Sequence, residues 1–191
     1  MEIKEGSLTF VFAENAKSIK FDDTNFYRKK FNKLPGGKGV DIIVDDKDRL
    51  QLIEIKNCIG FETENVWRTS TNNSRANEGE DSFDIEVAKK VASTLACLYG
   101  AWSKQNSSDS TSELGSIWAG ACSKSIPRDE KPIYVILFLE GNFGAPGLEA
   151  RSKKAIMKNL QDSISNKLSW LNCRVSVVDS TTYPNKLFSL K

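Results

Sequence analysis

Hydrophobic residues alternate with polar ones, or run together, in five short segments of the chain, and both patterns are typical of β-strands. The longest run, residues 133–139 (IYVILFL), contains no charged side chain, so we expect a strand buried on both faces in mid-sheet. Two neighbouring segments flank the turn sequence DDKD and predict a hairpin. The predicted strands are residues 7–13, 40–44, 50–56, 133–139 and 175–178.

Four other segments repeat their hydrophobic residues every three or four positions, as amphipathic helices do. The clearest is 82–102, where Phe83, Val87 and Val91 begin one hydrophobic face. A first helix follows the capping sequence DDT and ends at Pro35-Gly36-Gly37. The predicted helices are residues 26–34, 82–102, 114–121 and 148–171.

Two polar segments separate these elements. Residues 57–81 are rich in Asn, Thr, Ser and Glu and predict a long mobile loop, a type of segment that often carries function. Residues 103–113 form a Ser-rich insert that we also expect to be mobile. No repeat or linker divides the chain, so we expect a single domain over 1–191. The order of elements predicts an α/β fold of mixed α+β type, with one mixed sheet and helices on both sides.

The composition changes this picture mainly through the absence of histidine from all 191 residues. This absence excludes Ser-His-Asp and Cys-His hydrolases, His-ligated zinc or iron sites, and nucleases that activate water with imidazole. Acid–base or metal chemistry then depends on Asp, Glu, Lys, Cys or Tyr. The four cysteines are scattered without a C-x-x-C pair, which argues against zinc and indicates reduced thiols.

The chain carries no targeting signal that we recognise. Its first ten residues are charged and lack the hydrophobic region of a secretion signal, and no hydrophobic run is long enough to cross a bilayer. We therefore expect a cytoplasmic protein without membrane association. The net charge of +2 is too small to indicate a nucleic-acid partner by itself. Basic runs without acids at 28–38 and 151–158 either contact phosphates or form solvated helix faces.

Three ionisable residues fall on one face of the predicted hairpin. A turn of even length that pairs Val44 with Arg49 places Asp41 diagonal to Glu54 on the neighbouring strand. Lys56 shares that face because residues two apart in a strand point the same way. Such a group of charges at the ends of hydrophobic strands is costly to bury without a function or a metal.

This arrangement resembles the PD-(D/E)XK nuclease superfamily, which has an Asp on one strand and an acidic-x-Lys sequence on the next. The matching segment is KGVDIIVDDKDRLQLIEIKN, where Asp41 matches the first acid, Glu54 the second and Lys56 the lysine. Val40 stands where the family pattern has proline. Within the superfamily the chain looks like small bacterial proteins with an upstream segment, here KFDDTNFYR, and a lysine-containing helix, here VAKKVASTLA. The resemblance implies a restriction-endonuclease-like αβββαβ core, with a central mixed sheet flanked by helices.

The resemblance also implies a site for Mg²⁺ or Mn²⁺. The carboxylates of Asp41 and Glu54 are hard oxygen ligands suited to these ions, and the backbone carbonyl of Ile55 would add a further ligand. Lys56 would hold or help to deprotonate the attacking water, with its pKa lowered by burial beside the dication. Asp23, on the inward face of the first helix, is a candidate third metal ligand and equally a helix cap.

Three basic residues are candidates for binding the substrate. They are Lys38, just before the first acid; Lys90, on the inward side of the 82–102 helix; and Arg68, in the long polar segment. Lys90 is alternatively a solvated helix edge. Trp67 and Trp102 either stack on bases or close the core.

We therefore expect a metal-dependent nuclease that hydrolyses phosphodiester bonds, in DNA rather than RNA. One alternative is a non-catalytic nucleic-acid- or protein-binding module that retains the nuclease fold. Another is a structural protein in which Asp41, Glu54 and Lys56 form a buried salt bridge. A homodimer would pair two active sites for cutting both strands, although no sequence feature demands one.

Overall fold

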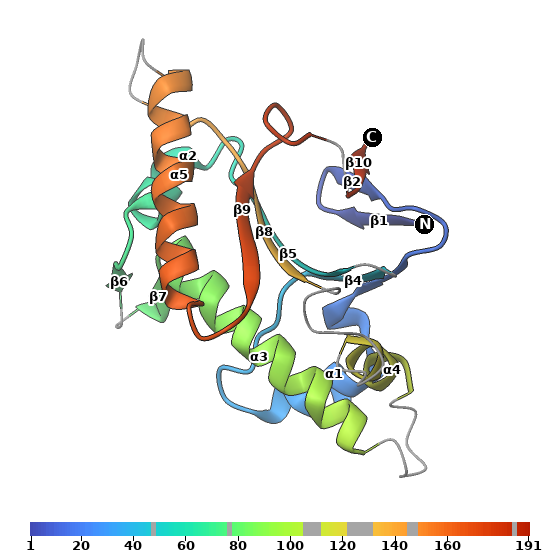
Figure 1. The fold of residues 1–191 in the computed structure, drawn as a ribbon. Coiled ribbons are helices and arrows are strands. Elements are labelled where there is room, and N and C mark those ends of the chain that lie inside the picture. The colour runs from blue at the N-terminus through green and yellow to red at the C-terminus, as the bar shows by residue number, and fades with distance from the viewer. Residues whose placement is uncertain (47–48, 76–77, 105–111, 122–131, 145–148, 185–186) are drawn as a thin grey trace.

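The computed structural model describes residues 1–46, 49–75, 78–104, 112–121, 132–144, 149–184 and 187–191. Its centre is a five-stranded mixed sheet in the order β3-β4-β5-β8-β9 (Figure 1). Strand β4 is antiparallel to both of its neighbours, β3 and β5, whereas β5, β8 and β9 run parallel to one another. The bounds are β3 Lys17–Lys20, β4 Ile42–Asp46, β5 Arg49–Asn57, β8 Ile133–Glu140 and β9 Cys173–Val178.

The main helices cover one face of this sheet (Figure 1). Leu52 and Leu137 of the strands belong to the same buried cluster as Val91, Ile117 and Leu160 of the helices. The helices are α1 Asn25–Lys29, α3 Phe83–Ser103, α4 Ser112–Ala121 and α5 Glu149–Lys167. The expected mixed sheet flanked by helices is therefore confirmed, and so are the helices predicted over 82–102 and 114–121.

A small three-stranded sheet, rather than helices, covers the opposite face (Figure 1). Ile53 and Phe138 of the main sheet pack there against Phe10 and Phe188. The expectations of a single sheet and of helices on both sides are therefore wrong. The strand predicted over 7–13 exists as β2, but it pairs with the two ends of the chain. The small sheet consists of β1 Glu2–Glu5, β2 Leu8–Val11 and β10 Ser189–Leu190.

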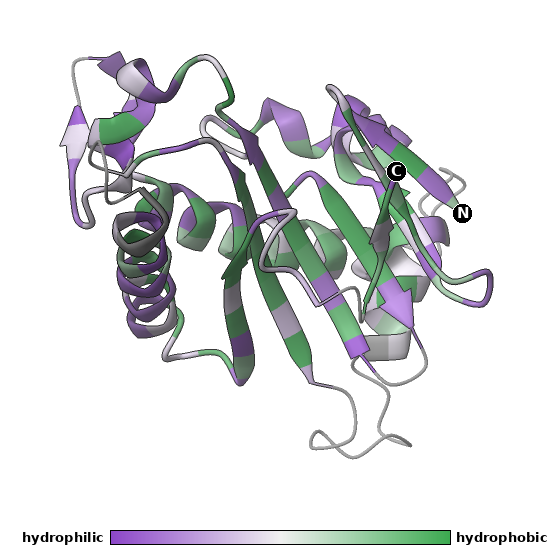
Figure 2. Ribbon diagram, turned by 90° about the horizontal axis from the view of Figure 1, so that it is seen from above, coloured by the Kyte–Doolittle hydropathy of each residue, from purple (hydrophilic) through white to green (hydrophobic). Residues whose placement is uncertain are grey.

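The central strands confirm the interpretation of the long hydrophobic run. Leu137 and Phe138 of β8 point to opposite faces, and both are fully buried. Figure 2 shows hydrophobic residues following the strands of the main sheet. A strand with a parallel neighbour on each side and a layer on each face needs hydrophobic side chains in both directions.

The hairpin of β4 and β5 differs in register from the prediction. Val44 pairs with Gln51, not with Arg49, and β4 continues to Asp46, which pairs with Arg49. The predicted turn DDKD is therefore shorter than expected, because Asp45 pairs with Lys17 of β3 and stays in the sheet. Because the register differs by two residues, every side chain keeps its predicted face.

The polar segment 57–81 contains short elements in its described parts instead of one long loop. Two short helical turns lead to a two-stranded ribbon, whose second strand precedes α3 directly. The first predicted helix is also shorter than expected, because α1 gives way to a 3-10 turn at Phe31–Lys33 (η2). Residues 105–111 of the Ser-rich insert lie outside the described residues. The elements are α2 Glu62–Asn65, η3 Val66–Thr69, β6 Ser74–Arg75 and β7 Glu80–Asp81.

The described helices include none that combines the length and the hydrophobicity needed to cross a membrane.

Asp84 joins the start of α3 to α5 and to the 57–81 segment. Its fully buried carboxylate accepts hydrogen bonds from Ser82, from Ser163 and from the backbone of Asn72, and it pairs with Lys167 at 2.7 Å. Burial alone would raise the pKa of Asp84, but the hydrogen bonds from Lys167, Ser82 and Ser163 lower it to about 2. The ionised carboxylate therefore stabilises the packing of these three parts of the chain.

We expect Asp84→Asn to lower the free energy of unfolding by about 2 kcal/mol at neutral pH. Because the folded-state pKa of Asp84 is depressed from 3.8, its contribution is fully present above about pH 4 and is lost as the pH falls toward 2. Urea denaturation across this range should show the difference between variant and wild type shrinking as the pH falls. Asp162→Asn removes an exposed pair with Lys158 and should cost less than about 0.5 kcal/mol. An equal loss in both variants would contradict the assignment.

Candidate functional site

Asp41, Glu54 and Lys56 lie at one end of the β4–β5 hairpin, on the face covered by α3. Asp41 directly precedes β4, and its Oδ2 accepts a hydrogen bond of 2.7 Å from the backbone N–H of Ile55. The Nζ of Lys56 lies 3.0 Å from Oε1 of Glu54. The three residues that the sequence singled out are therefore neighbours in space.

The chain before β4 is fixed at several points, and these set the position of Asp41. The backbone N–H of Phe21 donates to the carbonyl of Asp41 at 2.9 Å, and that of Val40 donates to the Thr94 hydroxyl of α3 at 3.0 Å. Gly39 lies under the ring of Phe21, where a Cβ would come within 2.1 Å of a ring carbon. Only glycine leaves room for this close approach.

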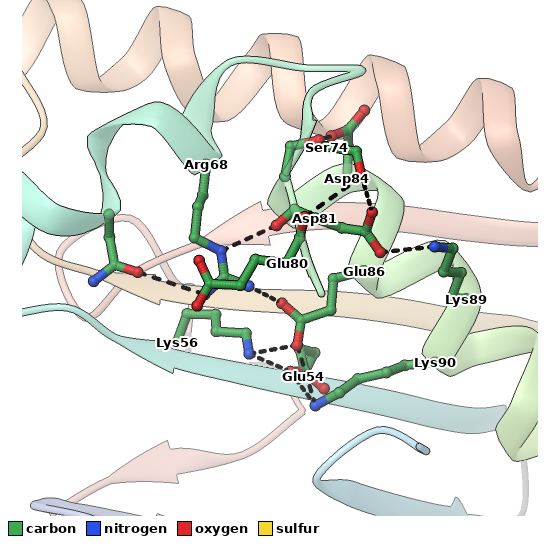
Figure 3. A network of polar contacts seen from close by, with 12 residues as sticks. Glu54, Lys56, Arg68, Ser74, Glu80, Asp81, Asp84, Glu86, Lys89 and Lys90 are labelled. Carbon is green, nitrogen blue, oxygen red and sulfur yellow. Dashed lines mark hydrogen bonds and ion pairs between the residues drawn. The ribbon is translucent and has the colours of Figure 1, made fainter. Parts of the chain in front are cut away.

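The helix α3 adds two charged residues, Glu86 and Lys90, to this group (Figure 3). The Nζ of Lys90 lies 2.6 Å from Oε1 of Glu54 and 3.7 Å from Oδ1 of Asp41. Glu86 accepts a hydrogen bond of 2.8 Å from Lys56 and lies 3.7 Å from Lys90. Glu86 and Lys90 are four residues apart, so they stand on the same side of the helix, toward the hairpin.

Arg68 of η3 completes the group from the opposite direction (Figure 3). Its guanidinium pairs with Glu86, donates to the carbonyl of Asp81 at 3.1 Å and stacks 4.6 Å from the ring centroid of Phe83. The connected group then contains three carboxylates and three cations and is balanced in formal charge. Its members are Asp41, Glu54, Glu86, Lys56, Lys90 and Arg68.

Burial dominates the electrostatics of the two hairpin acids. The Glu54 side chain is 1% exposed, and burial together with the charge of Asp41 raises its pKa to about 7, against the effect of Lys56 and Lys90. Burial also raises the pKa of Asp41, although Lys90 and the Ile55 N–H oppose this. For Lys56, burial is outweighed by Glu54 and Glu86, so its pKa is raised. The lowered pKa that we expected of Lys56 therefore does not arise from the protein groups.

Several oxygen atoms of the site suit a hard cation. Oε2 of Glu54 is buried and has no hydrogen-bond partner. The carbonyl of Ile55 points to the same side of β5 as its N–H, toward the chain before β4, because both groups of a strand residue point to one neighbour. Within the described ranges, no three acidic or cysteine side chains form a ready metal cluster. The donor set is two carboxylates and one carbonyl, as hard cations prefer.

The three predicted substrate-binding residues line one cavity beside this group. Lys38, Arg68 and Lys90 surround a space of about 380 Å³, together with Glu86. The polar segment supplies another wall through Glu80 and Asp81. The cavity therefore adjoins the group of paired charges through three residues that belong to both, Arg68, Glu86 and Lys90.

Asp23 is not part of this arrangement. It lies in the 3-10 turn η1 (Phe21–Asp23), pairs with Arg28 and lines a different cavity with Met1 and Lys4. Thr24, not Asp23, caps α1, because its hydroxyl accepts the N–H of Tyr27. Asp23 does not share the inward face of α1, because the helix begins after it. The contacts of the described residues do not place Asp23 beside Asp41 or Glu54, so they do not support it as a metal ligand.

The two tryptophans lie outside the group of paired charges. The guanidinium of Arg75 lies over the Trp67 ring, 4.2 Å from the ring centroid. Trp102 contacts the ring of Tyr99 near the end of α3.

Sequence reasoning missed two acids that belong to the electrostatics of this site. Glu86 had a usable signal, because it lies four residues before Lys90 and next to the inward-facing Val87. Glu5 of β1 had none. Its charge contributes to the raised pKa of Asp41, and it comes near only because the small sheet folds back over the main one.

One family model matches the chain, that of a family of unknown function (DUF6661), over residues 24–191. The match includes β4, β5, β8 and β9, and all the residues of the group of paired charges. No curated protein and no solved structure matches the chain. The chain therefore belongs to this family of unknown function, DUF6661.

Proposed function

We propose that this protein is a metal-dependent nuclease that hydrolyses phosphodiester bonds in DNA with two carboxylates and a lysine. The observation that carries the proposal is the meeting of Asp41, Glu54 and Lys56 at one end of the hairpin. The buried Oε2 of Glu54, which lacks a hydrogen-bond partner, supports it further. A carboxylate placed in this way is costly unless a ligand uses it.

The arrangement of the main sheet supports the resemblance to the PD-(D/E)XK superfamily. Three antiparallel strands, β3, β4 and β5, are followed by α3 and by β8 parallel to β5. This order corresponds to the βββαβ part of the αβββαβ core. The departure is that α1 lies between β3 and β4 instead of before the first strand.

Asp41, Glu54 and the carbonyl of Ile55 would hold Mg²⁺ or Mn²⁺. When bound, such an ion supplies a Lewis acid for the phosphate and a lower pKa for the attacking water. The protein's own part is to hold two hard oxygen ligands side by side at a site where both carboxylates are largely buried.

The basic residues have separate tasks in this proposal. Lys56, fixed between Glu54 and Glu86, orients the attacking water and offsets charge that develops on the phosphate. Lys38, Arg68 and Lys90 line the neighbouring cavity and bind the phosphates on either side of the cleaved bond. No imidazole is needed for any of these steps, which is consistent with a chain without histidine.

One observation favours the second candidate, a non-catalytic module that retains the fold. The group of paired charges is balanced by protein residues alone, with Lys90 between the two hairpin acids. A protein that had lost its metal would need such compensation. The two experiments that follow separate an active site from this alternative and from a purely structural salt bridge.

We expect the purified protein to cleave plasmid or single-stranded DNA in Mg²⁺ or Mn²⁺, and EDTA to abolish the cleavage. Lys56→Ala should lower the rate about 10²–10³-fold, because it removes a cation placed at the developing charge. Lys158→Ala is the matched control, since Lys158 is an exposed lysine of α5 that pairs with Asp162. Cleavage that persists in EDTA or in Lys56→Ala would show that the activity comes from elsewhere.

We expect Glu54→Gln to raise the melting temperature at about pH 8.5 in EDTA, and this gain to disappear near pH 5. Burial raises the folded-state pKa of Glu54 from 4.5 to about 7, so the wild type loses stability as the pH rises through this window, whereas glutamine cannot ionise. Thermal denaturation followed by circular dichroism gives the comparison. A structural salt bridge predicts the opposite, a lower melting temperature for Glu54→Gln above pH 7.

A further inference from the structure

The ammonium group of Lys90 lies between the two carboxylates to which the proposed function assigns a divalent ion. Its Nζ is 2.6 Å from Oε1 of Glu54 and 3.7 Å from Oδ1 of Asp41. The side chain reaches this position from α3, across the space between the helix and the hairpin (Figure 3). Only 12% of the Lys90 side chain is exposed.

The adjacent lysine shows that this position is specific to Lys90. Lys89 also lines the cavity, but its side chain is 68% exposed and pairs with Asp81 on the ribbon at 2.7 Å. The two residues have the same chemistry and neighbouring places in the helix, yet only Lys90 contacts both hairpin acids. The chain thus contains a natural control for any effect of a lysine at the start of α3.

Two carboxylates buried side by side cannot both remain ionised without a cation nearby. Lys56 and Lys90 both lie beside Oε1 of Glu54, on the same carboxylate as the unpartnered Oε2, but of these two lysines Lys90 is the one that also pairs with Asp41. A divalent ion that binds Asp41 and Glu54 would bring two positive charges to within a few ångströms of the ammonium. Repulsion between like charges at this range favours movement of the Lys90 ammonium, which lies between the two ligands, away from the ion.

An alternative partner for the ammonium is already in place. Oε1 of Glu86, which also accepts a hydrogen bond from Lys56, lies 3.7 Å from Nζ of Lys90 and one helical turn before it, so a rotation of the Lys90 side chain would bring the two closer without movement of the helix. Both Glu86 and Lys90 line the cavity with Lys38 and Arg68. An ammonium that turns toward Glu86 therefore also turns toward the space in which the substrate phosphate would lie.

We propose that Lys90 is an exchangeable counter-ion: it neutralises Asp41 and Glu54 until a divalent ion binds, and it then moves onto Glu86 to become a phosphate-binding residue of the cavity. This inference rests on the proposed function for the presence of the ion. It goes beyond that function by making metal binding and formation of the phosphate site a single step, carried by one side chain.

Calorimetric titration with Mn²⁺ tests the exchange in wild type, Lys90→Met, Lys89→Met and Glu54→Gln. Lys90→Met should bind Mn²⁺ at least about tenfold more tightly than wild type, because the ion no longer displaces a charge-assisted contact. Lys89→Met should bind with wild-type affinity, and Glu54→Gln should lose binding. Equal or weaker binding by Lys90→Met would overturn the exchange while leaving the proposed nuclease site standing. No binding by wild type or by Lys90→Met would overturn both.

A second measurement uses the wild-type protein and does not depend on the folding of Lys90→Met. Lysine labelled with ¹³C at Cε reports each side chain by nuclear magnetic resonance, and Lys90→Arg assigns the signal of Lys90. Addition of diamagnetic Mg²⁺ should move the Lys90 signal in proportion to binding, while the Lys89 signal stays in place. A Lys90 signal that does not move at saturating Mg²⁺ would contradict the exchange.

Discussion

The burial of two adjacent carboxylates at one end of a hydrophobic sheet is the constraint on which the rest of the site depends. Asp41 lies just before β4 and Glu54 lies within β5, and burial raises the pKa of each. In such surroundings each negative charge needs a cation or hydrogen-bond donor within a few ångströms. The backbone N–H of Ile55 donates a hydrogen bond to one oxygen of Asp41, and the ammonium groups of Lys56 and Lys90 pair with Oε1 of Glu54.

The helix α3 and the preceding polar segment are organised around this requirement. Lys90 and Glu86 of this helix place a cation and an anion over the hairpin. Arg68 pairs with Oε2 of Glu86, the oxygen that does not face Lys90. The start of the helix is in turn held by Asp84, whose hydrogen bonds fix it to α5 and to the 57–81 segment. The stability of this corner and the geometry of the site therefore depend on the same helix.

The arrangement has two chemical interpretations, and the unpartnered Oε2 of Glu54 favours a ligand-binding site over a purely structural network. A structural network satisfies its buried polar atoms, because each unsatisfied one is costly. Here one oxygen of Glu54 is left free, on a carboxylate that shares the ammonium of Lys90 with Asp41. A hard cation would use this oxygen, and for this reason we prefer the nuclease to the binding module. The family to which the chain belongs is one of unknown function and favours neither interpretation.

The sequence by itself determined the strands of the hairpin, the long buried strand, α3 and α4, and the common face of Asp41, Glu54 and Lys56. These features depend on local periodicity, and a period of two keeps side chains on their faces even though the register was wrong by two residues. Only the tertiary structure decided the rest. The strands β1, β3 and β10 contain at most four residues each, too few for a pattern. Strands β3 and β10 form because partners distant in the sequence pair with them, and β1 pairs with the neighbouring β2. Glu86 lies in the site although the sequence did not predict it there, and Asp23 lies outside the site although the sequence did. In both cases the position of a charged side chain depends on how helices pack on the sheet, which local spacing does not encode.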